Sequence, residues 1–323
     1  MTAADSTVPM MAAVRFHDYG EPAEVLHLEQ IPVPSPGPGR VRVRVHACGL
    51  NPADWALCRG LFAGQLPRGV GLEVSGTVDA VGDGVTDAAI GDRVLGTADY
   101  AGSPSAGASD AAVLNHWTPV PAGLDLLQAA ALPMAVETAY RSLGNLGVAG
   151  GQTLLVHGAD TTVGFAAAQI ALMRGVRVFA TAGDTYAGQL RNLGASVTSY
   201  GAGVADRVLH LAGGPVDLVL DTAPASGALP DLLRAAGGDP RRVLTISDFA
   251  AAADLGVRTS IGEDPTLRYD VLGEYAQHAA AGRFTIPIAA TFPLDDWRTA
   301  LDTSLSGHPR GKLLLLPTSP TVR

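Results

Sequence analysis

The sequence contains little cysteine, little lysine and no long hydrophobic run. Cys48 and Cys58 are too few for a disulfide framework or a four-cysteine zinc site, and they fit a reducing compartment. No apolar stretch approaches the roughly 18 residues that span a membrane. The first residues lack the basic and apolar regions of a secretory signal. We therefore expect a cytoplasmic protein in which residues 1–10 form a disordered leader.

Positive charge is scarce and dispersed. The 22 Lys and Arg side chains include a single lysine, Lys312, and the formal net charge is −9. Neither a block of like charges nor a basic stripe is present, which argues against nucleic acid and anionic membranes as partners.

The pattern of hydrophobic residues changes near residue 125 of the 323. Before it, short strands such as Val41–Val45, with strict alternation, are separated by Gly and Pro turns, which predicts an all-β, barrel-like domain. After it, strand-like and helix-like segments alternate from 153 to 246, which predicts a parallel βαβ sheet. The length is typical of two domains.

The segment 153–171 is typical of a mononucleotide-binding unit. Thr153–His157 is a buried strand, Gly158–Gly164 a turn and Val163–Met173 a helix. In such a turn, free N–H groups and the positive end of the helix dipole face a pyrophosphate. The predicted cofactor-binding residues of the turn are Gly158, Ala159, Asp160, Thr161, Thr162, Val163 and Gly164.

The middle of this turn is polar where glycine is expected. Thr161 stands where a glycine lets the backbone approach the pyrophosphate. Two outcomes remain open: Thr161 and Thr162 hydrogen-bond the phosphates, or their branched side chains, with Asp160 beside an anion, weaken binding. The repulsion at stake is on the order of 1–3 kcal/mol.

Six segments follow one another along the chain: ACGLNPADWALCRG (47–60), GLEVSGTVDAVGDGV (71–85), IGDRVLG (90–96), AAALPMAVETAYRSL (129–143), the turn itself and GHPRGKLLLL (307–316). In this order they resemble the medium-chain dehydrogenase/reductase superfamily, and more narrowly its zinc-free quinone oxidoreductase branch.

The resemblance implies an α/β protein with two domains. A GroES-like β-barrel catalytic domain would comprise residues 11–125 and 265–323, and an inserted Rossmann domain, a doubly wound parallel sheet, residues 126–264. It also implies an active site in the cleft, a small-molecule substrate and a homodimer formed through the last Rossmann strand near 255–262.

A catalytic zinc is not expected. Such a site needs about three ligands from Cys, His, Asp or Glu. The positions that carry Cys and His in zinc-dependent relatives resemble Asn51 and Leu72, and only Glu73 remains beside them.

The loop after the second Rossmann strand favours NADPH. Thr181-Ala182-Gly183 carries no acidic residue to bind a ribose 2′-hydroxyl. Gly183 and Tyr200 match the NADPH-using relatives, whereas Tyr186 stands at their lysine position, so that Arg191 or Lys312 would have to supply the cation. Tyr200 could equally be an aromatic residue packed between helices.

The resemblance also implies the residues of the catalytic cleft. We expect Asn51, Asp54, Trp55 and Tyr140 as catalytic residues, with Thr138 and Lys312 near the cofactor. Asp54 could instead cap the helix that follows it, and Tyr140 could be core packing.

Two classes of function follow. The first is NADPH-dependent, zinc-independent hydride transfer to a quinone or an α,β-unsaturated carbonyl. The second is a protein of the same fold that has lost or repurposed hydride transfer, such as a cyclase, an isomerase or a ligand-binding protein.

Overall fold

The computed structural model describes residues 8–261, 266–307 and 309–317. The chain divides into two units. Unit 1 comprises the chain up to Met134 together with Gly273–Arg283 and the segment from Ile288 onward. Unit 2 comprises Ala135–Leu272 and Phe284–Pro287. In the part of the chain that the structure describes, no helix has both the length and the apolar character needed to cross a membrane.

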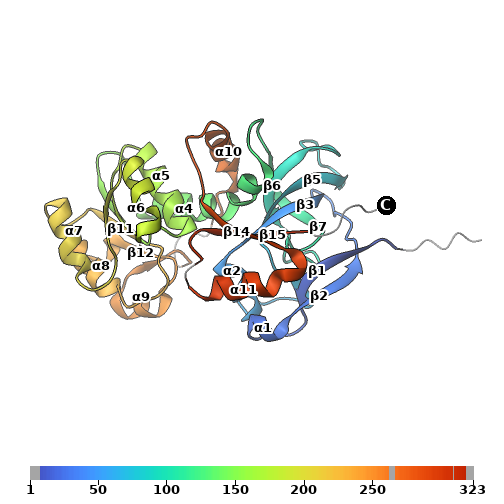
Figure 1. Cartoon of the computed structure of the whole chain (residues 1–323), viewed down its shortest axis with the longest axis horizontal. Coiled ribbons are helices and arrows are strands. Elements are labelled where there is room, and N and C mark those ends of the chain that lie inside the picture. The colour runs from blue at the N-terminus through green and yellow to red at the C-terminus, as the bar shows by residue number, and fades with distance from the viewer. Residues whose placement is uncertain (1–7, 262–265, 308, 318–323) are drawn as a thin grey trace, which may run out of the picture. The chain divides into compact units, whose positions relative to one another are not determined.

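Unit 1 is built on β-strands (Figure 1). Its main sheet has the order β14-β15-β3-β5-β6-β7, and pairing of β3 with β7 closes it into a barrel. A smaller sheet has the order β2-β1-β4. The strands are β1 Met10–Phe16, β2 Leu26–Pro32, β3 Val41–Leu50, β4 Arg68–Gly69, β5 Glu73–Val81, β6 Arg93–Ala98, β7 Ala111–Pro119, β14 Ile288–Pro293 and β15 Lys312–Leu316.

The alternation at Val41–Val45 places the three valines in the barrel core. The apolar run Lys312–Leu316 near the end of the chain forms β15 and pairs with β3. The expected leader is partly wrong: the Pro9 carbonyl accepts from Val33 N, and Met10 pairs with Pro32 in β1. The rest of that segment, residues 1–7, lies outside the described residues.

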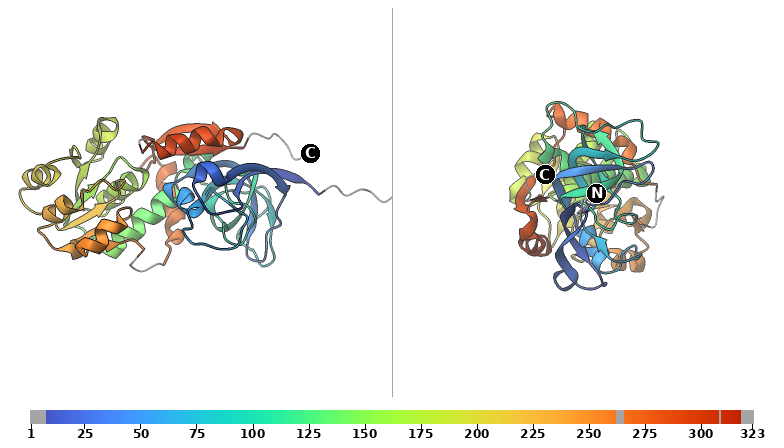
Figure 2. Two further views of the ribbon diagram at one scale, coloured as in Figure 1. Left: turned by 90° about the horizontal axis from the view of Figure 1, so that it is seen from below. Right: turned by 90° about the vertical axis from the view of Figure 1, so that its right-hand side faces the viewer.

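The helices of unit 1 are short. They are α1 Pro22–Val25, α2 Pro52–Cys58, α3 Leu126–Ala130, α10 Leu272–Ala280 and α11 Trp297–Leu305. The helix α11 buries Trp297, Ala300 and Leu301 and packs against β14 and β15 (Figure 2). The helix begins only at Trp297, because Phe292 and Pro293 extend β14 and a 3₁₀ turn over Leu294–Asp296 follows them.

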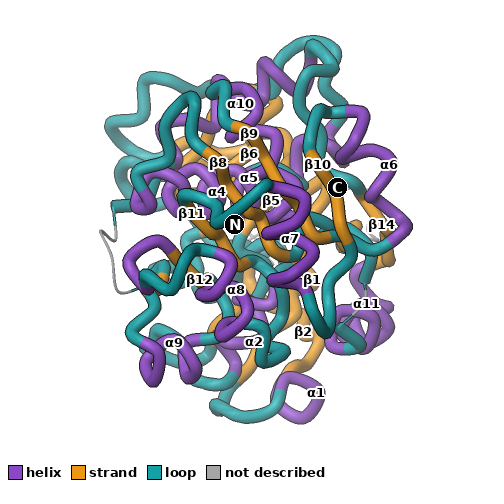
Figure 3. Tube along the Cα trace, turned by 90° about the vertical axis from the view of Figure 1, so that its left-hand side faces the viewer, coloured by secondary structure: helices purple, strands orange, loops and turns teal. Residues whose placement is uncertain are grey.

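Unit 2 contains a parallel sheet with the order β10-β9-β8-β11-β12-β13 (Figure 3). Its strands are β8 Thr153–His157, β9 Arg177–Thr181, β10 Ser196–Thr198, β11 Leu218–Asp221, β12 Val243–Thr245 and β13 Arg258–Thr259. This is the Rossmann order, which reverses between β8 and β11, and ligands bind at such a reversal beyond the carboxyl ends of the strands. The predicted fold class is therefore confirmed.

One helix precedes these strands, and further helices connect them. They are α4 Pro133–Leu146, α5 Thr162–Met173, α6 Asp184–Asn192, α7 Val204–Ala212, α8 Leu229–Ala235 and α9 Phe249–Leu255. The helix α5 is buried without interruption from Gly164 to Ala171, which explains its apolar sequence. The last strand, expected near 255–262, is β13, which begins only at Arg258 because α9 extends to Leu255 and Gly256 ends it in the left-handed conformation. Residue 262 lies outside the described residues.

We predict that Gly164→Ala destabilises the protein. A methyl group there would overlap the Gly158 carbonyl oxygen and lie 2.5 Å from Thr222 Oγ1. The free energy of unfolding, measured by urea denaturation, should fall by about 1–3 kcal/mol. The matched control is Gly188→Ala on the exposed face of α6, where a methyl group meets nothing within 4 Å. The control should leave stability unchanged or raise it by up to about 1 kcal/mol. Equal losses in both variants would contradict the prediction.

Candidate functional site

The carboxyl ends of β8 and β11 meet at the reversal of the sheet order. Gly158 has a φ of +74°, and a Cβ there would lie 2.7 Å from Ala223 N, so the position requires glycine. Thr222 Oγ1 lies 2.8 Å from the His157 carbonyl oxygen and 3.0 Å from that of Gly158. Thr222 therefore fixes the start of the turn, a role for which no sequence pattern gave a signal.

Thr161 caps the helix α5. Its Oγ1 accepts a hydrogen bond of 3.0 Å from Gly164 N, and it also lies 3.2 Å from Thr222 Oγ1. Its φ of −77° and ψ of 161° lie in the extended region, so the backbone here does not need glycine. Because the first N–H groups of a helix are its anion donors, the Thr161 cap removes one of them from a bound phosphate.

Asp160 connects the loops after β8 and β9. Its Oδ2 accepts a hydrogen bond of 2.9 Å from Gly183 N, the residue that precedes α6. Tyr200 flanks the same glycine: a Cβ on Gly183 would lie 3.3 Å from the Tyr200 hydroxyl and 3.4 Å from Asp160 Oδ2. The structure thus brings together three of the predicted cofactor-binding residues at the end of β9.

The two tyrosines near this point differ in exposure. Tyr186 is 9% exposed and stands edge-on to Phe165, with ring centroids 5.8 Å apart. Burial, followed by the charge of Asp160, raises the pKa of its hydroxyl. Tyr200 is 52% exposed, so the alternative of an aromatic residue packed between helices does not hold.

Arg207 of α7 supplies the positive charge nearest to Tyr200 along the chain. Its Nη1 donates to the Ala202 carbonyl at 2.7 Å, and its Nη2 donates to the Ser199 carbonyl at 3.0 Å and to the Tyr200 carbonyl at 3.2 Å. Arg191 lies in the last turn of α6, at the end of the helix opposite to Gly183. The turn that follows β10 positions Arg207, and periodicity alone does not reveal such a contact.

Lys312 lies in a buried ion pair in unit 1. Its Nζ contacts Glu73 Oε1 and donates to Asn51 Oδ1 at 2.6 Å, while Asn51 Nδ2 donates to Glu73 Oε1 at 2.8 Å. Glu73 Oε2 accepts from Met134 N at 2.7 Å. Lys312 is 1% exposed, and this burial argues against the expected contact of its ammonium with a cofactor.

Asp54 and Trp55 are likewise engaged within unit 1. Asp54 is fully buried, and its two oxygens accept from three backbone N–H groups, those of Asn51, Gly71 and Leu72. Burial raises the pKa of the Asp54 carboxyl to about 6 in spite of these bonds. This geometry corresponds to the capping alternative rather than to a catalytic acid. Trp55 is 3% exposed, and its Nε1 donates to Ser304 Oγ at 2.7 Å.

Tyr140 is placed away from the turn. Its ring lies against Arg174 and Arg268, whose guanidinium carbons are 4.4 and 4.8 Å from the ring centroid. Arg174 follows the last residue of α5, and a helix of this length spans about 18 Å, so Tyr140 lies at the far end of α5 from the glycine turn. The half-buried Tyr140 ring thus lies against two arginine side chains, and its role as a proton donor stays a prediction.

Thr138 lies beside a buried salt bridge that the sequence analysis did not identify. Glu137 Oε1 accepts from Arg141 Nε at 2.6 Å and from Arg268 N at 3.2 Å. Thr138 Oγ1 is 3.4 Å from Glu137 Oε2. The spacing of Glu137 and Arg141, four residues apart on a helix, is the signal that could have predicted the pair.

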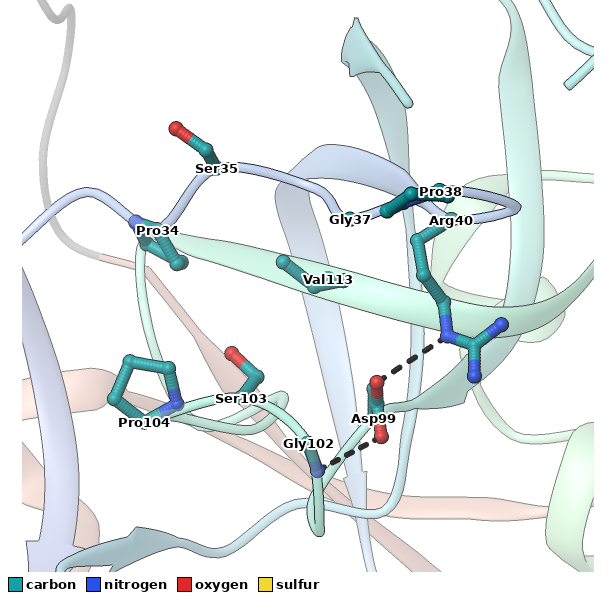
Figure 4. A pocket seen from close by; sticks show the side chains of 10 residues that line it. All are labelled: Pro34, Ser35, Gly37, Pro38, Arg40, Asp99, Gly102, Ser103, Pro104 and Val113. Carbon is teal, nitrogen blue, oxygen red and sulfur yellow. Dashed lines mark hydrogen bonds and ion pairs between the residues drawn. The ribbon is translucent and has the colours of Figure 1, made fainter. Parts of the chain in front are cut away.

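A cavity of about 250 Å³ opens in unit 1 (Figure 4). Arg40 Nε donates to Asp99 Oδ2 at 3.2 Å at its edge, and Gly102 N donates to Asp99 Oδ1 at 3.0 Å. None of the predicted site residues is among those that line it. The cavity is therefore separate from the candidate site.

A zinc ion does not fit the residues present. Asn51 and Leu72 are not zinc ligands, and both oxygens of Glu73 are already hydrogen-bonded or paired. The described residues contain no group of three His, Cys, Asp or Glu side chains arranged to hold a metal ion. The position of the turn suits a dinucleotide better, because it follows β8 at the reversal of the sheet order, where ligands of such sheets bind.

We predict that Lys312→Met destabilises unit 1 by leaving the Glu73 charge buried without a partner. The free energy of unfolding should fall by about 3–5 kcal/mol. The double variant Lys312→Met with Glu73→Gln should recover part of this loss, because glutamine carries no charge. Urea denaturation of both proteins measures the difference, and equal losses would show that packing rather than charge is the cause.

Comparison with known proteins gives matches along most of the chain. Residues 37–120 match the alcohol dehydrogenase GroES-like domain, and residues 193–315 match the zinc-binding dehydrogenase domain. The quinone oxidoreductase of Homo sapiens is 31% identical over 332 residues, covering 95% of this chain and 98% of that protein. That of Rattus norvegicus is 36% identical over 179 residues, a match that spans 54% of each protein.

Among solved structures, the quinone oxidoreductase from Coxiella burnetii superposes with a TM-score of 0.80 at 26% identity, covering 95% of this chain and 99% of that one. This superposition and the full-length human match agree with the fold described above. The chain therefore belongs to the quinone oxidoreductases of the medium-chain dehydrogenase/reductase superfamily, a family of oxidoreductases that bind a nicotinamide cofactor.

Proposed function

We propose that the protein transfers a hydride from NADPH to a quinone or an α,β-unsaturated carbonyl compound, without zinc. The observation that carries the proposal is the turn between β8 and α5, with Gly158 and Gly164 at the reversal of a Rossmann sheet. The bound nicotinamide would supply the hydride, so the chain itself needs to bind, orient and desolvate the reactants.

Three features near the end of β9 support NADPH. The segment Thr181-Ala182-Gly183 has no acidic side chain of its own, the Tyr200 side chain is half exposed beside Gly183, and Arg207 lies against the Tyr200 carbonyl. An arginine and a tyrosine hydroxyl are suitable partners for a 2′-phosphate.

Zinc independence is supported by the buried ion pair. The Lys312 ammonium brings a positive charge to Glu73, the one carboxylate left from a zinc-binding set. Asn51 uses one Nδ2 hydrogen on Glu73 and retains a second, which we propose for the substrate, with Trp55 as a positioning residue.

A second candidate function is a protein of this fold without hydride transfer, such as a cyclase, an isomerase or a ligand-binding protein. It is favoured by two backbone N–H groups that already donate to side chains of the protein and so are not available to a phosphate. Gly164 N donates to Thr161 Oγ1, and Gly183 N donates to Asp160 Oδ2.

Assembly and location are also proposals. We propose a homodimer through the edge of the unit 2 sheet at β13, because an unpaired edge strand is usually covered and Ile261 beside it is 61% exposed. We propose a cytoplasmic location, which suits the free and buried thiols of Cys48 and Cys58.

The decisive experiment is a calorimetric titration with NADPH and NADH, followed by turnover assays with a quinone and an enone panel. We expect saturable NADPH binding and substrate-dependent loss of NADPH absorbance. Prior dialysis against a chelator should leave the rate unchanged, with metal content checked by elemental analysis. Absence of binding of either dinucleotide at millimolar concentration would favour the second candidate, and loss of activity on chelation would refute zinc independence.

A further inference from the structure

We propose that Asp160 is a specificity-determining residue that weakens the selection of NADPH over NADH. The inference rests on the proposed function, since it concerns the dinucleotide site of unit 2. It assigns to the glycine turn a task that is ordinarily performed at the end of the second strand, namely contact with the adenosine ribose.

The Asp160 carboxylate lies at the end of the second strand of the sheet, β9. Asp160 belongs to the loop after β8, yet its Oδ2 lies 2.9 Å from Gly183 N, two residues beyond the end of β9. An acidic side chain at this end of the second strand is the group that hydrogen-bonds a ribose 2′-hydroxyl. The strand itself supplies no such acid, but the neighbouring loop delivers one to the same place.

The carboxylate has the capacity for this contact. Within the described part of the chain, Gly183 N is the single hydrogen-bond donor to Asp160, and Asp160 is partly exposed. Its Oδ1 therefore retains its lone pairs for a hydroxyl donor. A 2′-phosphate has no comparable donor and carries negative charge, so the same carboxylate repels it.

The surrounding groups act in the opposite direction. The Tyr200 hydroxyl flanks Gly183, and Arg207 binds the carbonyls of the loop that carries Tyr200. These groups favour a phosphate, whereas Asp160 disfavours it. Asp184 is the acidic residue next to Gly183 in the chain, but its side chain is exposed at the start of α6. We therefore infer that Tyr200 and Arg207 favour NADPH over NADH and that Asp160 reduces this preference.

The variant Asp160→Asn tests the inference. The asparagine carbonyl oxygen can still accept from Gly183 N, so the contact between the loops is kept while the charge is removed. We expect the Kd for NADPH to fall by about ten-fold, which corresponds to about 1.4 kcal/mol. The Kd for NADH should rise or change by less than about three-fold. Calorimetric titration of both dinucleotides at fixed ionic strength measures the ratio.

The matched control is Asp184→Asn, which removes the same charge from an exposed neighbouring position. It should change either Kd by less than about three-fold, because an exposed charge is screened by solvent and salt. Asp160→Ser is a second test variant, and the thermal midpoint of each protein verifies folding. Serine also removes the charge, but its side chain is one bond shorter than that of aspartate and does not preserve the 2.9 Å contact with Gly183 N. The same shift in the ratio of the two Kd values in both variants would assign the effect to the charge rather than to the contact.

The outcomes separate the inference from the proposed function. An unchanged ratio in folded Asp160→Asn, or an equal gain for both dinucleotides, overturns the inference alone. An equal gain would mean that Asp160 obstructs the site as a whole. If neither dinucleotide binds the wild type or any variant, the proposed function fails and the inference fails with it.

Discussion

The ion pair between Lys312 and Glu73 is the constraint on which unit 1 depends. Burying two charges costs several kcal/mol per ion unless every donor and acceptor is matched. Here Asn51 bridges both partners, and Met134 N binds the remaining carboxylate oxygen. The cluster therefore links β3, β5 and the returning strand β15 to the first turn of α4. The single lysine of the chain thus holds the returning strand β15 against β3 and β5 of the barrel.

The matching of donors and acceptors also explains the different roles of Asp54 and Asp160, both of which the sequence placed in the site. Asp54 and Asp160 are short carboxylates that accept backbone N–H groups from a loop distant in sequence. Asp54 is enclosed, so its oxygens are all used within the barrel. Asp160 remains partly exposed and uses a single hydrogen bond, so it keeps capacity for a ligand. Burial, rather than residue type, separates a structural carboxylate from one that can act on a ligand.

More of the fold than of the candidate site could be predicted from the sequence. The bounds of β8, β15 and α7 follow from local periodicity, and the alternation of strands and helices predicts the parallel sheet. The roles of Tyr140 and Lys312 could not be predicted in this way, because they depend on partners about 30 and 240 residues away in sequence, Arg174 and Glu73. Thr222 was missed for the same reason, because its partners His157 and Gly158 lie about 65 residues away. Arg207 was missed for a different reason: its partners are near in sequence, but the turn after β10 places them around its guanidinium, and periodicity does not report turn geometry.

The polar turn of this chain separates two requirements that glycine-rich motifs usually combine. Gly158 is needed for its positive φ and Gly164 for close packing, and both are retained. Thr161 occupies an extended conformation open to any residue, and its hydroxyl stabilises α5 as a cap. The glycine expected in the middle of the turn is thus a requirement of the ligand and not of the fold. Substitutions there can tune or abolish dinucleotide binding while the Rossmann sheet stays intact, which is why fold and cofactor choice must be tested separately in this protein.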